Sequence, residues 1–349
     1  MATVINDVRA GRRSGTIAVV GDSNQAGHGA GSGARGLKDA RSFAPPRLCA
    51  DFLCAYGIPA QEVGVFGAAG TGSEYYNYDR RVVMEDGWSA GSSGPGGGYF
   101  QNSSTKHPLL FNSDIPFDTL TIWHTQDVTN GDFQLDWGCP AEALTFSTRG
   151  DRAMIKQTIS LPIEIHNIRI QRCDQTGIVG ILGWTTQERH KAKFDIWNLG
   201  ICGARIATAN LETHPWSPRR AVTAMKPDIV ILDLGTNDMV NTSLDEFKLQ
   251  NAQVIEAHRQ TSDIILCTPI ARKADLVPEE LQVKYADAIR EIASDEGLPL
   301  LDIRRYFGDY QFAAKNRLYF DATHLNRRGH ALKGRLIAHA LQSISQIME

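Results

Sequence analysis

The sequence predicts an α/β fold with three layers, a parallel sheet between two layers of helices, interrupted by an inserted antiparallel β-sandwich. Short apolar runs alternate with helical patterns near the N-terminus and again after residue 195, which is typical of a parallel sheet. Short segments of alternating polarity fill residues 118–184, which is typical of a sandwich. With 349 residues, the chain also exceeds the size at which a single hydrophobic core usually stops growing, so two cores are expected.

The first strand and helix lie within residues 16–60. The apolar run at residues 17–20 ends at a glycine and predicts a buried strand, and the apolar spacing of RLCADFLCAYG predicts a helix over residues 47–56. GVFGAAGTGSEYYNYD and GWSAGSSGPGGGYF are so rich in glycine and serine that we expect long loops there. Segments such as DTLTIWHT, ALTFST and HNIRIQR then alternate in polarity and indicate strands.

Beyond residue 195, strands and helices alternate. The strands are FDIWNLG, DIVILDLG, DIILCTP and PLLDI, and helices are predicted over residues 218–225, 244–260, 279–294 and 329–347. Because the first strand precedes the β-rich block, we expect residues 1–73 and 190–349 to form one discontinuous α/β domain. Residues 74–189 would form the inserted sandwich, which is a candidate for carbohydrate binding.

Charge and hydropathy exclude several classes of partner. The formal net charge is −3, the isoelectric point is near 6.4 and the basic residues are scattered, so no nucleic-acid surface is expected. No apolar run reaches the length of a membrane span, and the N-terminal segment MATVINDVRAGRRSG lacks the apolar core of a secretion signal. We therefore expect a cytoplasmic protein; a virion component, or a secreted chain without its signal, would look the same. The sequence does not predict an oligomeric state.

No sequence motif predicts a metal or a cofactor. The six cysteines form no CxxC pair and no zinc-like spacing with histidine, and we expect mostly buried thiols: Cys49, Cys54, Cys139, Cys173, Cys202 and Cys267. A GxGxxG pattern at residues 31–36 begins about ten residues after the strand, whereas phosphate binding requires it directly at the strand end.

Three polar clusters lie at the carboxyl ends of apolar runs that we expect to be strands, the last of them directly after RLYF. Ser23 lies in GDSN, Asn237 in GTND, and Asp321 and His324 in DATH. Because the carboxyl ends of parallel strands meet at one rim, these side chains can share a site. A histidine that takes the serine proton, a carboxylate that holds the imidazole and an amide that stabilises an oxyanion are the groups that nucleophilic acyl transfer needs.

These blocks resemble those of the SGNH hydrolases, also called the GDSL esterase family. The resemblance covers about residues 16–60 and 195–349, and it implies a three-layer α/β/α fold and an ester substrate. It implies Ser23 as nucleophile, His324 as base and Asp321 as the residue that orients the base. The oxyanion hole would consist of the backbone N–H groups of Ser23 and Gly203 and the amide of Asn237.

The second block has four candidate glycines. NLGICGAR contains Gly200 and Gly203, whereas GVFGAAG contains Gly67 and Gly70. We favour Gly203 because a helix and then the asparagine strand follow it directly. The long stretch between the first and second blocks departs from the family pattern, although some relatives that deacetylate polysaccharides carry a β-sandwich there.

Other polar and aromatic residues have simpler explanations. Ser89 fits GxSxG, but the following SSGPGGG cannot form the helix which that motif requires. Asp238 is expected to anchor its turn by local hydrogen bonds. We expect four histidines to pack or to face solvent: His124, His166, His330 and His339. Contact with substrate and ordinary packing or solvation both remain open for Arg205, Trp88, Tyr99 and Trp184.

The predicted function is hydrolysis of an ester through a covalent acyl-enzyme, without a metal or other cofactor. The insertion favours O-acetyl groups on carbohydrate as the substrate. One alternative is an acyltransferase that uses the same triad and passes the acyl group to a sugar hydroxyl. Another is an inactive carbohydrate-binding or adhesin protein, but binding alone does not need a complete catalytic set.

Overall fold

A parallel sheet of six strands forms the centre of the chain. The computed structural model describes residues 1–67, 78–103, 107–174 and 176–346. The strand order is β17-β16-β15-β1-β14-β2. The strands are β1 (Gly15–Gly21), β2 (Ala60–Gln61), β14 (Phe194–Gly200), β15 (Ile229–Asp233), β16 (Asp263–Cys267) and β17 (Leu300–Leu301). β1 therefore pairs on both sides with strands that come much later in the sequence.

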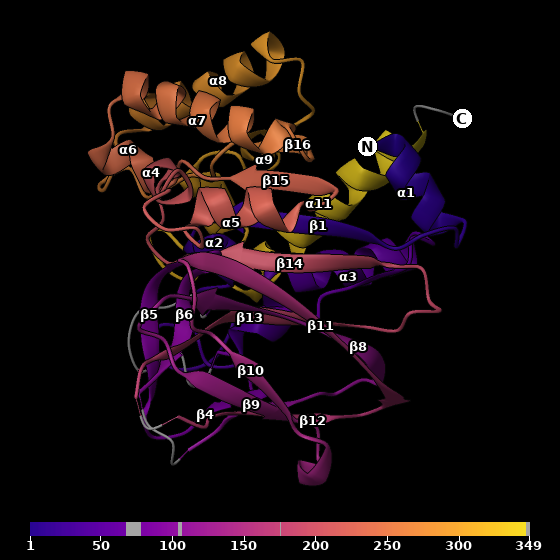
Figure 1. Ribbon diagram of the computed structural model, residues 1–349. Coiled ribbons are helices and arrows are strands. Elements are labelled where there is room, and N and C mark those ends of the chain that lie inside the picture. Colours follow the sequence, from indigo (N-terminus) through magenta and orange to yellow (C-terminus); the bar gives the residue numbers. More distant parts are fainter. Residues whose placement is uncertain (68–77, 104–106, 175, 347–349) are drawn as a thin grey trace.

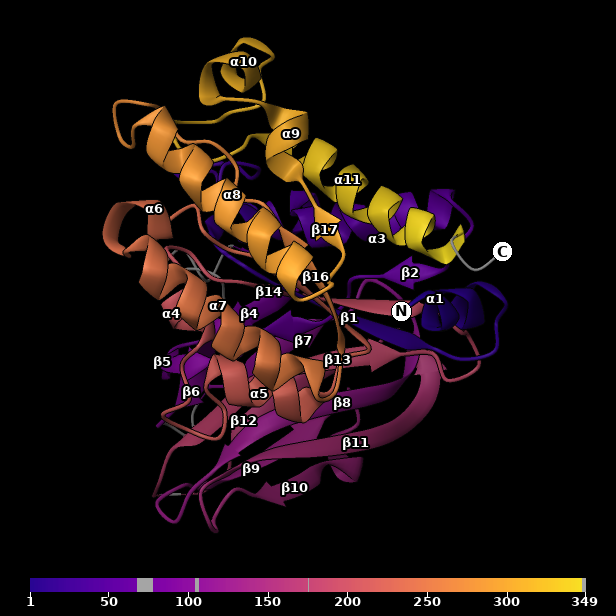
Figure 2. The ribbon, with the colours of Figure 1, turned by 90° about the horizontal axis from the view of Figure 1, so that it is seen from above.

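Helices cover both faces of this sheet (Figures 1 and 2). On one face lie α1 (Ala2–Arg9), α3 (Pro45–Ala55) and α11 (Arg327–Gln346); on the other lie α4 (Ile206–Ala209), α5 (Pro218–Met225), α7 (Leu244–Arg259) and α8 (Glu279–Asp295). Alternation along β1 explains the two layers, because Ile17 and Val19 belong to the first core and Ala18 and Val20 to the second. The predicted three-layer α/β/α domain is confirmed.

Short helices lie in the connections. They are α2 (Ser23–Ala26), η1 (Ala40–Phe43), η3 (Pro140–Glu142), α6 (Asp238–Asn241), α9 (Ile303–Phe307) and α10 (Tyr310–Lys315). Among the residues described, no helix is both long enough and apolar enough to cross a membrane.

Two antiparallel sheets form the predicted sandwich. One has the order β10-β9-β12-β7-β4 and the other β11-β8-β13-β6-β5, with β3 paired to β13. The strands are β3 (Val65–Phe66), β4 (Val82–Met84), β5 (Trp88–Gly94), β6 (Gly97–Asn102), β7 (Leu109–Asn112), β8 (Phe117–Gln126), β9 (Asp132–Asp136), β10 (Leu144–Ser147), β11 (Ala153–Glu164), β12 (Asn167–Arg172) and β13 (Val179–Gln187). Both sheets contribute to one apolar core, for example Phe111 and Phe133 from the first and Ile122 and Ile181 from the second.

Part of the glycine-rich stretch that we expected to be loop is a β-hairpin. β5 and β6 pair antiparallel, with Gly91 opposite Tyr99. A Cβ on Gly91 would lie 2.2 Å from the Tyr99 ring, so glycine is needed where this ring crosses the neighbouring strand. Ser89 lies in β5 and precedes no helix. The other glycine-rich stretch lies mostly outside the described residues, as does the predicted domain limit between residues 73 and 74.

The sandwich packs directly against the parallel sheet. Phe66 of β3, Trp123 of β8 and Trp197 of β14 form a cluster in which each ring centroid lies within 5.9 Å of the other two. All three side chains belong to the core that also contains Ala18 and Val20 of β1. In Figure 1 the sandwich occupies the lower half of the molecule, beneath β14. One core therefore joins the two parts of the chain.

The expectation of mostly buried thiols is wrong. Cys49 and Cys267 are buried, whereas Cys54, Cys139 and Cys173 are exposed and Cys202 is half-buried. Cys139 directly precedes the short η3 helix, and Cys173 follows the end of β12 between Arg172 and Asp174, so neither lies in a buried apolar run.

A buried ion pair joins the sheet to α11. Lys333 Nζ lies 2.5 Å from Asp233 Oδ2, and both side chains are at most 3% exposed. Gln25 of α2 donates a hydrogen bond to the same carboxylate oxygen. These contacts connect three elements below the carboxyl end of β1.

We predict that Lys333→Met lowers the free energy of unfolding by about 3–5 kcal/mol, because it leaves a buried carboxylate without its cation. Urea denaturation measures the difference. Lys284→Met replaces an exposed lysine on α8 and serves as the control, with an expected change of less than about 0.5 kcal/mol. Equal stability of the two variants would contradict this role of the ion pair.

Candidate active site

Ser23 begins a short helix at the carboxyl end of β1. Asp22 caps this helix by accepting a hydrogen bond from the N–H of Asn24 at 2.8 Å. A Cβ on Gly21 would lie 2.3 Å from the Gln25 side chain and 3.1 Å from the Asp233 carbonyl oxygen, so a glycine is needed at the last position of the strand. Within the described residues the Ser23 N–H has no hydrogen-bond acceptor. It is available to a ligand.

The DATH segment forms a tight turn that the Asp321 side chain holds together. Asp321 Oδ1 accepts hydrogen bonds from the N–H groups of Thr323 and His324, both at 2.7 Å. The second oxygen, Oδ2, lies 2.8 Å from His324 Nδ1. Although partial burial acts to raise the pKa of Asp321, the hydrogen bonds from His324 and Thr323 outweigh it and lower the pKa. The carboxylate is therefore charged at neutral pH.

The structure brings Ser23, His324 and Asp321 together in one chain of hydrogen bonds. His324 Nε2 lies 3.0 Å from Ser23 Oγ, across 301 positions of sequence. When Nδ1–H donates to Asp321, Nε2 carries the lone pair and accepts the Ser23 hydroxyl proton. Ser23 is 3% exposed, whereas the His324 and Asp321 side chains are 18% and 42% exposed. The arrangement suits a serine nucleophile with a histidine base.

Asn24 and Gly29 hold the DATH turn against the serine turn. Asn24 Oδ1 accepts a hydrogen bond from the N–H of Leu325 at 3.0 Å. A Cβ on Gly29 would lie only 2.4 Å from the Leu325 carbonyl oxygen, and the φ of Gly29 is +89°. Sequence analysis assigned a role to neither residue, although Asn24 directly follows Ser23 in GDSN.

Asn237 and the loop after β14 lie beside this chain of hydrogen bonds. Ile201 N–H donates to the Gly21 carbonyl at 2.9 Å, which continues the β1–β14 pairing toward Ser23. Asn237 Nδ2 donates to the Ala204 carbonyl at 2.9 Å. The Gly203 N–H, like that of Ser23, has no acceptor within the described residues. The amide of Asn237 is thus anchored next to a free backbone donor.

The surroundings of the second-block glycines differ. A Cβ on Gly200 would lie 2.3 Å from Ala26 N, and one on Gly67 would lie 1.8 Å from the Gly98 carbonyl oxygen, so both are packed against backbone. Gly203 is exposed, has a φ of +78° and has no atom within 4 Å of such a Cβ. Gly70 lies outside the described residues. Of the three described glycines, Gly203 alone combines an open surrounding with a place beside Asn237.

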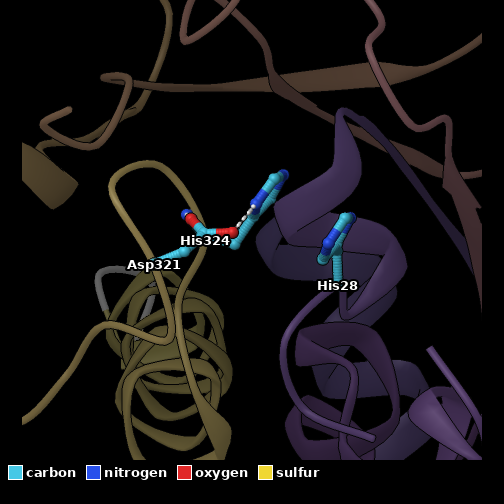
Figure 3. Close-up of side chains that lie close together, drawn as sticks. All are labelled: His28, Asp321 and His324. Atoms are coloured by element: carbon cyan, nitrogen blue, oxygen red, sulfur yellow. Dashed lines mark hydrogen bonds and ion pairs between the residues drawn. The ribbon is translucent and has the colours of Figure 1, made fainter. Parts of the chain in front are cut away.

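His28 lies face to face with His324, and sequence analysis did not identify it. The two ring centroids are 3.6 Å apart and the ring planes differ by 4° (Figure 3). His28, Asp321 and His324 each offer a ligand atom within 4.8 Å of the others. However, imidazole nitrogens bind metals in the plane of the ring, and two parallel planes 3.6 Å apart do not meet at one ion. This stack must open before both histidines could bind one metal.

The remaining predicted residues have structural roles. Asp238 accepts hydrogen bonds from the Ile206 N–H at 3.1 Å and from Thr242 at 3.3 Å, and burial raises its pKa to about 6. His330 is buried and lies 2.9 Å from the His28 carbonyl oxygen. Trp88 and Trp184 are buried in the sandwich core, whereas Tyr99 and Arg205 are half-buried. Neither tryptophan is open to a sugar ring.

Comparison with known proteins adds a family and a fold. Residues 176–332 match the GDSL-like Lipase/Acylhydrolase family, a stretch that includes Gly203, Asn237, Asp321 and His324 but not Ser23. No curated protein matches the chain. A structure described as a peptidoglycan O-acetylesterase in action superposes with a TM-score of 0.71 at 14% sequence identity, covering 99% of this chain and 95% of that one.

A second structure covers only part of the chain. The acetylxylan esterase Axe2 from Geobacillus stearothermophilus aligns at 20% identity and a TM-score of 0.36, over 43% of this chain and 73% of that one. The family match and the observed α/β/α fold lead to one conclusion. Residues 176–332 carry the GDSL-like lipase/acylhydrolase signature of an SGNH hydrolase domain, which makes the protein a carboxylic ester hydrolase, and an additional antiparallel β-domain lies within the parallel fold.

Proposed function

We propose that this protein is a serine esterase that removes O-acetyl groups from carbohydrate through an acyl-enzyme on Ser23. The observation that carries the proposal is the continuous chain Ser23–His324–Asp321, with heavy-atom distances of 3.0 and 2.8 Å. These distances are within the range for proton transfer between a nucleophile and its base. No other residue pair is needed to activate the serine.

The reaction proceeds in two steps at the same carbonyl carbon. Ser23 Oγ attacks the acyl carbon while His324 Nε2 takes its proton, and the resulting imidazolium gives that proton to the departing sugar oxygen. Water then enters, gives a proton to His324 and attacks the acyl-enzyme, which releases acetate and returns the proton to Ser23. Asp321 is charged throughout and stabilises the imidazolium.

The negative charge on the carbonyl oxygen needs fixed donors in each step. The free N–H groups of Ser23 and Gly203 and the amide of Asn237 would supply them. Asp238 supports these donors indirectly, because its carboxylate accepts the N–H of Ile206 and so holds the loop that carries Gly203.

A polar pocket supports carbohydrate as the carrier of the acetyl group. It has a volume of about 160 Å³ and is lined by Arg272, Glu279, Asp309, Tyr310, Gln311 and Ala274. Tyr310 joins it to the triad, because its hydroxyl donates to the Asp321 carbonyl at 3.3 Å. Charged and amide side chains of this kind suit the hydroxyl groups of a sugar. The shared two-part fold with a peptidoglycan O-acetylesterase supports the same substrate class.

An acyltransferase remains the second candidate, because the same triad permits transfer to a sugar hydroxyl instead of water. Product analysis distinguishes the two: free acetate indicates hydrolysis, and a new sugar ester formed at the expense of acetate indicates transfer.

We predict that Ser23→Ala abolishes hydrolysis of p-nitrophenyl acetate without unfolding the protein, and that a fluorophosphonate labels Ser23. The reason is that, of the serines that the structure describes, only Ser23 has its hydroxyl within hydrogen-bond distance of His324. Mass spectrometry of the labelled peptide identifies the site. Ser89→Ala is the control, since Ser89 lies in β5 and should keep full activity. Label on any other serine, with Ser23 unmodified, would refute the mechanism.

We predict that Asn237→Ala lowers kcat by about 10²–10³ with little change in KM, the usual effect of removing one oxyanion donor. Steady-state kinetics measures both constants. Asn237→Asp keeps the size of the side chain but removes its N–H groups, so it should be at least as impaired. If only KM rises, Asn237 acts in substrate binding rather than on the oxyanion.

We predict that acetyl esters are hydrolysed at least tenfold better than octanoyl esters, as judged by kcat/KM for the two p-nitrophenyl esters. A long acyl chain needs an apolar groove, whereas the pocket next to Asp321 is lined mainly by charged and polar side chains. Release of acetate from acetylated polysaccharides should accompany this preference. A preference for octanoate would refute the carbohydrate proposal and leave the esterase mechanism intact.

A further inference from the structure

The mechanism above gives no role to His28, although its imidazole covers one face of the base. Both ring nitrogens of His324 are occupied, one by Asp321 and the other by Ser23. The two faces of that ring take part in neither hydrogen bond. The His28 ring lies on one of them in a nearly parallel stack, with 3.6 Å between centroids (Figure 3).

We propose that His28 is a positioning residue for the catalytic base. Its ring face holds His324 in the plane that joins Asp321 to Ser23, and it stabilises the positive charge that His324 carries after it takes the serine proton. The inference rests on the proposed triad and adds a fourth side chain to it.

The backbone fixes His28 in this position from two directions. Its N–H donates to the Ser23 carbonyl oxygen at 2.9 Å, so His28 is tied to the nucleophile's own turn. Its carbonyl oxygen lies 2.9 Å from Nε2 of His330, a buried residue of α11. The close contact of Gly29 with the Leu325 carbonyl brings the two turns together. These backbone contacts therefore fix the position from which the His28 ring stacks on His324.

The geometry favours the protonated base over the neutral one. Two neutral aromatic rings prefer an offset or an edge-to-face arrangement to a direct face-to-face stack. Once one ring carries a proton, the other ring's face attracts the positive charge. An interaction that strengthens as His324 takes the proton stabilises the transition state more than the resting enzyme.

His28 can act in this way only while it is neutral. Burial, followed by the charge of His324, lowers the pKa of His28 to about 4, Arg35 acts in the same direction, and Asp321 opposes them. On the α11 side, burial lowers the pKa of His330 to about 3, so that ring is also neutral. Above about pH 5, His28 therefore presents an uncharged face to the base.

The proposal depends on the ring face of His28 and not on its ring nitrogens. Within the part of the chain that the structure describes, neither ring nitrogen of His28 has a hydrogen-bond partner. A phenylalanine would keep a flat π face at this position and lose the nitrogens. A leucine would fill similar space and lose the π face. The two substitutions separate the contribution of the face from that of volume.

The test compares His28→Leu with His28→Phe in hydrolysis of p-nitrophenyl acetate between pH 5 and 8. We expect His28→Leu to lower kcat about tenfold with KM nearly unchanged, and His28→Phe to remain within about threefold of the parent protein. Loss of support for the imidazolium makes His324 harder to protonate. The midpoint of the acid limb of kcat/KM should therefore move down by about half a pH unit or more in the leucine variant only.

A readout without turnover separates this inference from the proposed function. In a Ser23→Ala background, NMR titration of the His324 ring, assigned with His324→Asn, should show a lower midpoint for His28→Leu than for His28→Phe. If thermal denaturation shows that the His28→Leu variant is unfolded, His28→Met takes its place. Persisting esterase activity in Ser23→Ala would refute the proposed function, while this titration would still report on the stack.

Two results would overturn the inference. If the leucine and phenylalanine variants both match the parent in kcat and in midpoint, the ring face contributes nothing. If phenylalanine is as damaging as leucine, the nitrogens of His28 matter, and its role is a hydrogen bond to substrate or water instead of the stack.

Discussion

The hydrogen bond between His324 Nε2 and Ser23 Oγ depends on where the parallel strands end. β1 pairs with β14 and β15 so that Gly21 lies opposite both Gly200 and Asp233. The loops that follow these three strands therefore start at the same level of the sheet. They carry Ser23, Gly203 and Asn237, which explains how residues from distant parts of the sequence come to lie at one edge of the sheet.

The site also needs support from below and from the side. Below it, the buried Asp233 joins Lys333 of α11 and Gln25 of α2, so the helix that begins at Ser23 and the helix that follows DATH are fixed to the same strand. At the side, Asn24 accepts the Leu325 N–H. The 3.0 Å contact between serine and histidine is thus supported by buried polar contacts that fix both turns to β15 and to each other.

The residues of this site that could be predicted from the sequence are those that lie in short motifs. Ser23 and Asn237 follow strands, and strand ends can be recognised from apolar runs. The expectation that DATH also follows a strand is wrong, because the preceding run RLYF lies after helix α10 and contributes only an isolated bridge between Tyr319 and Leu325. His28 and Asn24 could not be assigned in this way, because their roles depend on how closely the two turns approach in space. The hairpin of β5 and β6 was missed for a related reason: glycine lowers strand propensity, but Gly91 is needed beneath the Tyr99 ring, a contact that no local pattern reveals.

The position of the insertion explains how a sandwich can interrupt the sheet without disturbing the site. β2 and β14 are neighbours in the parallel sheet, with Ala60 opposite Phe194. β3 and β13, which follow β2 and precede β14, also pair with each other, with Phe66 opposite Gly183. The chain therefore leaves and returns at adjacent points, and the parallel sheet keeps its geometry regardless of what lies between. The cluster of Phe66, Trp123 and Trp197 then fixes the sandwich to β14, the strand whose following loop carries Gly203. Through this contact the insertion supports the strand that leads to Gly203, although Ser23, Asp321 and His324 all belong to the α/β part of the chain.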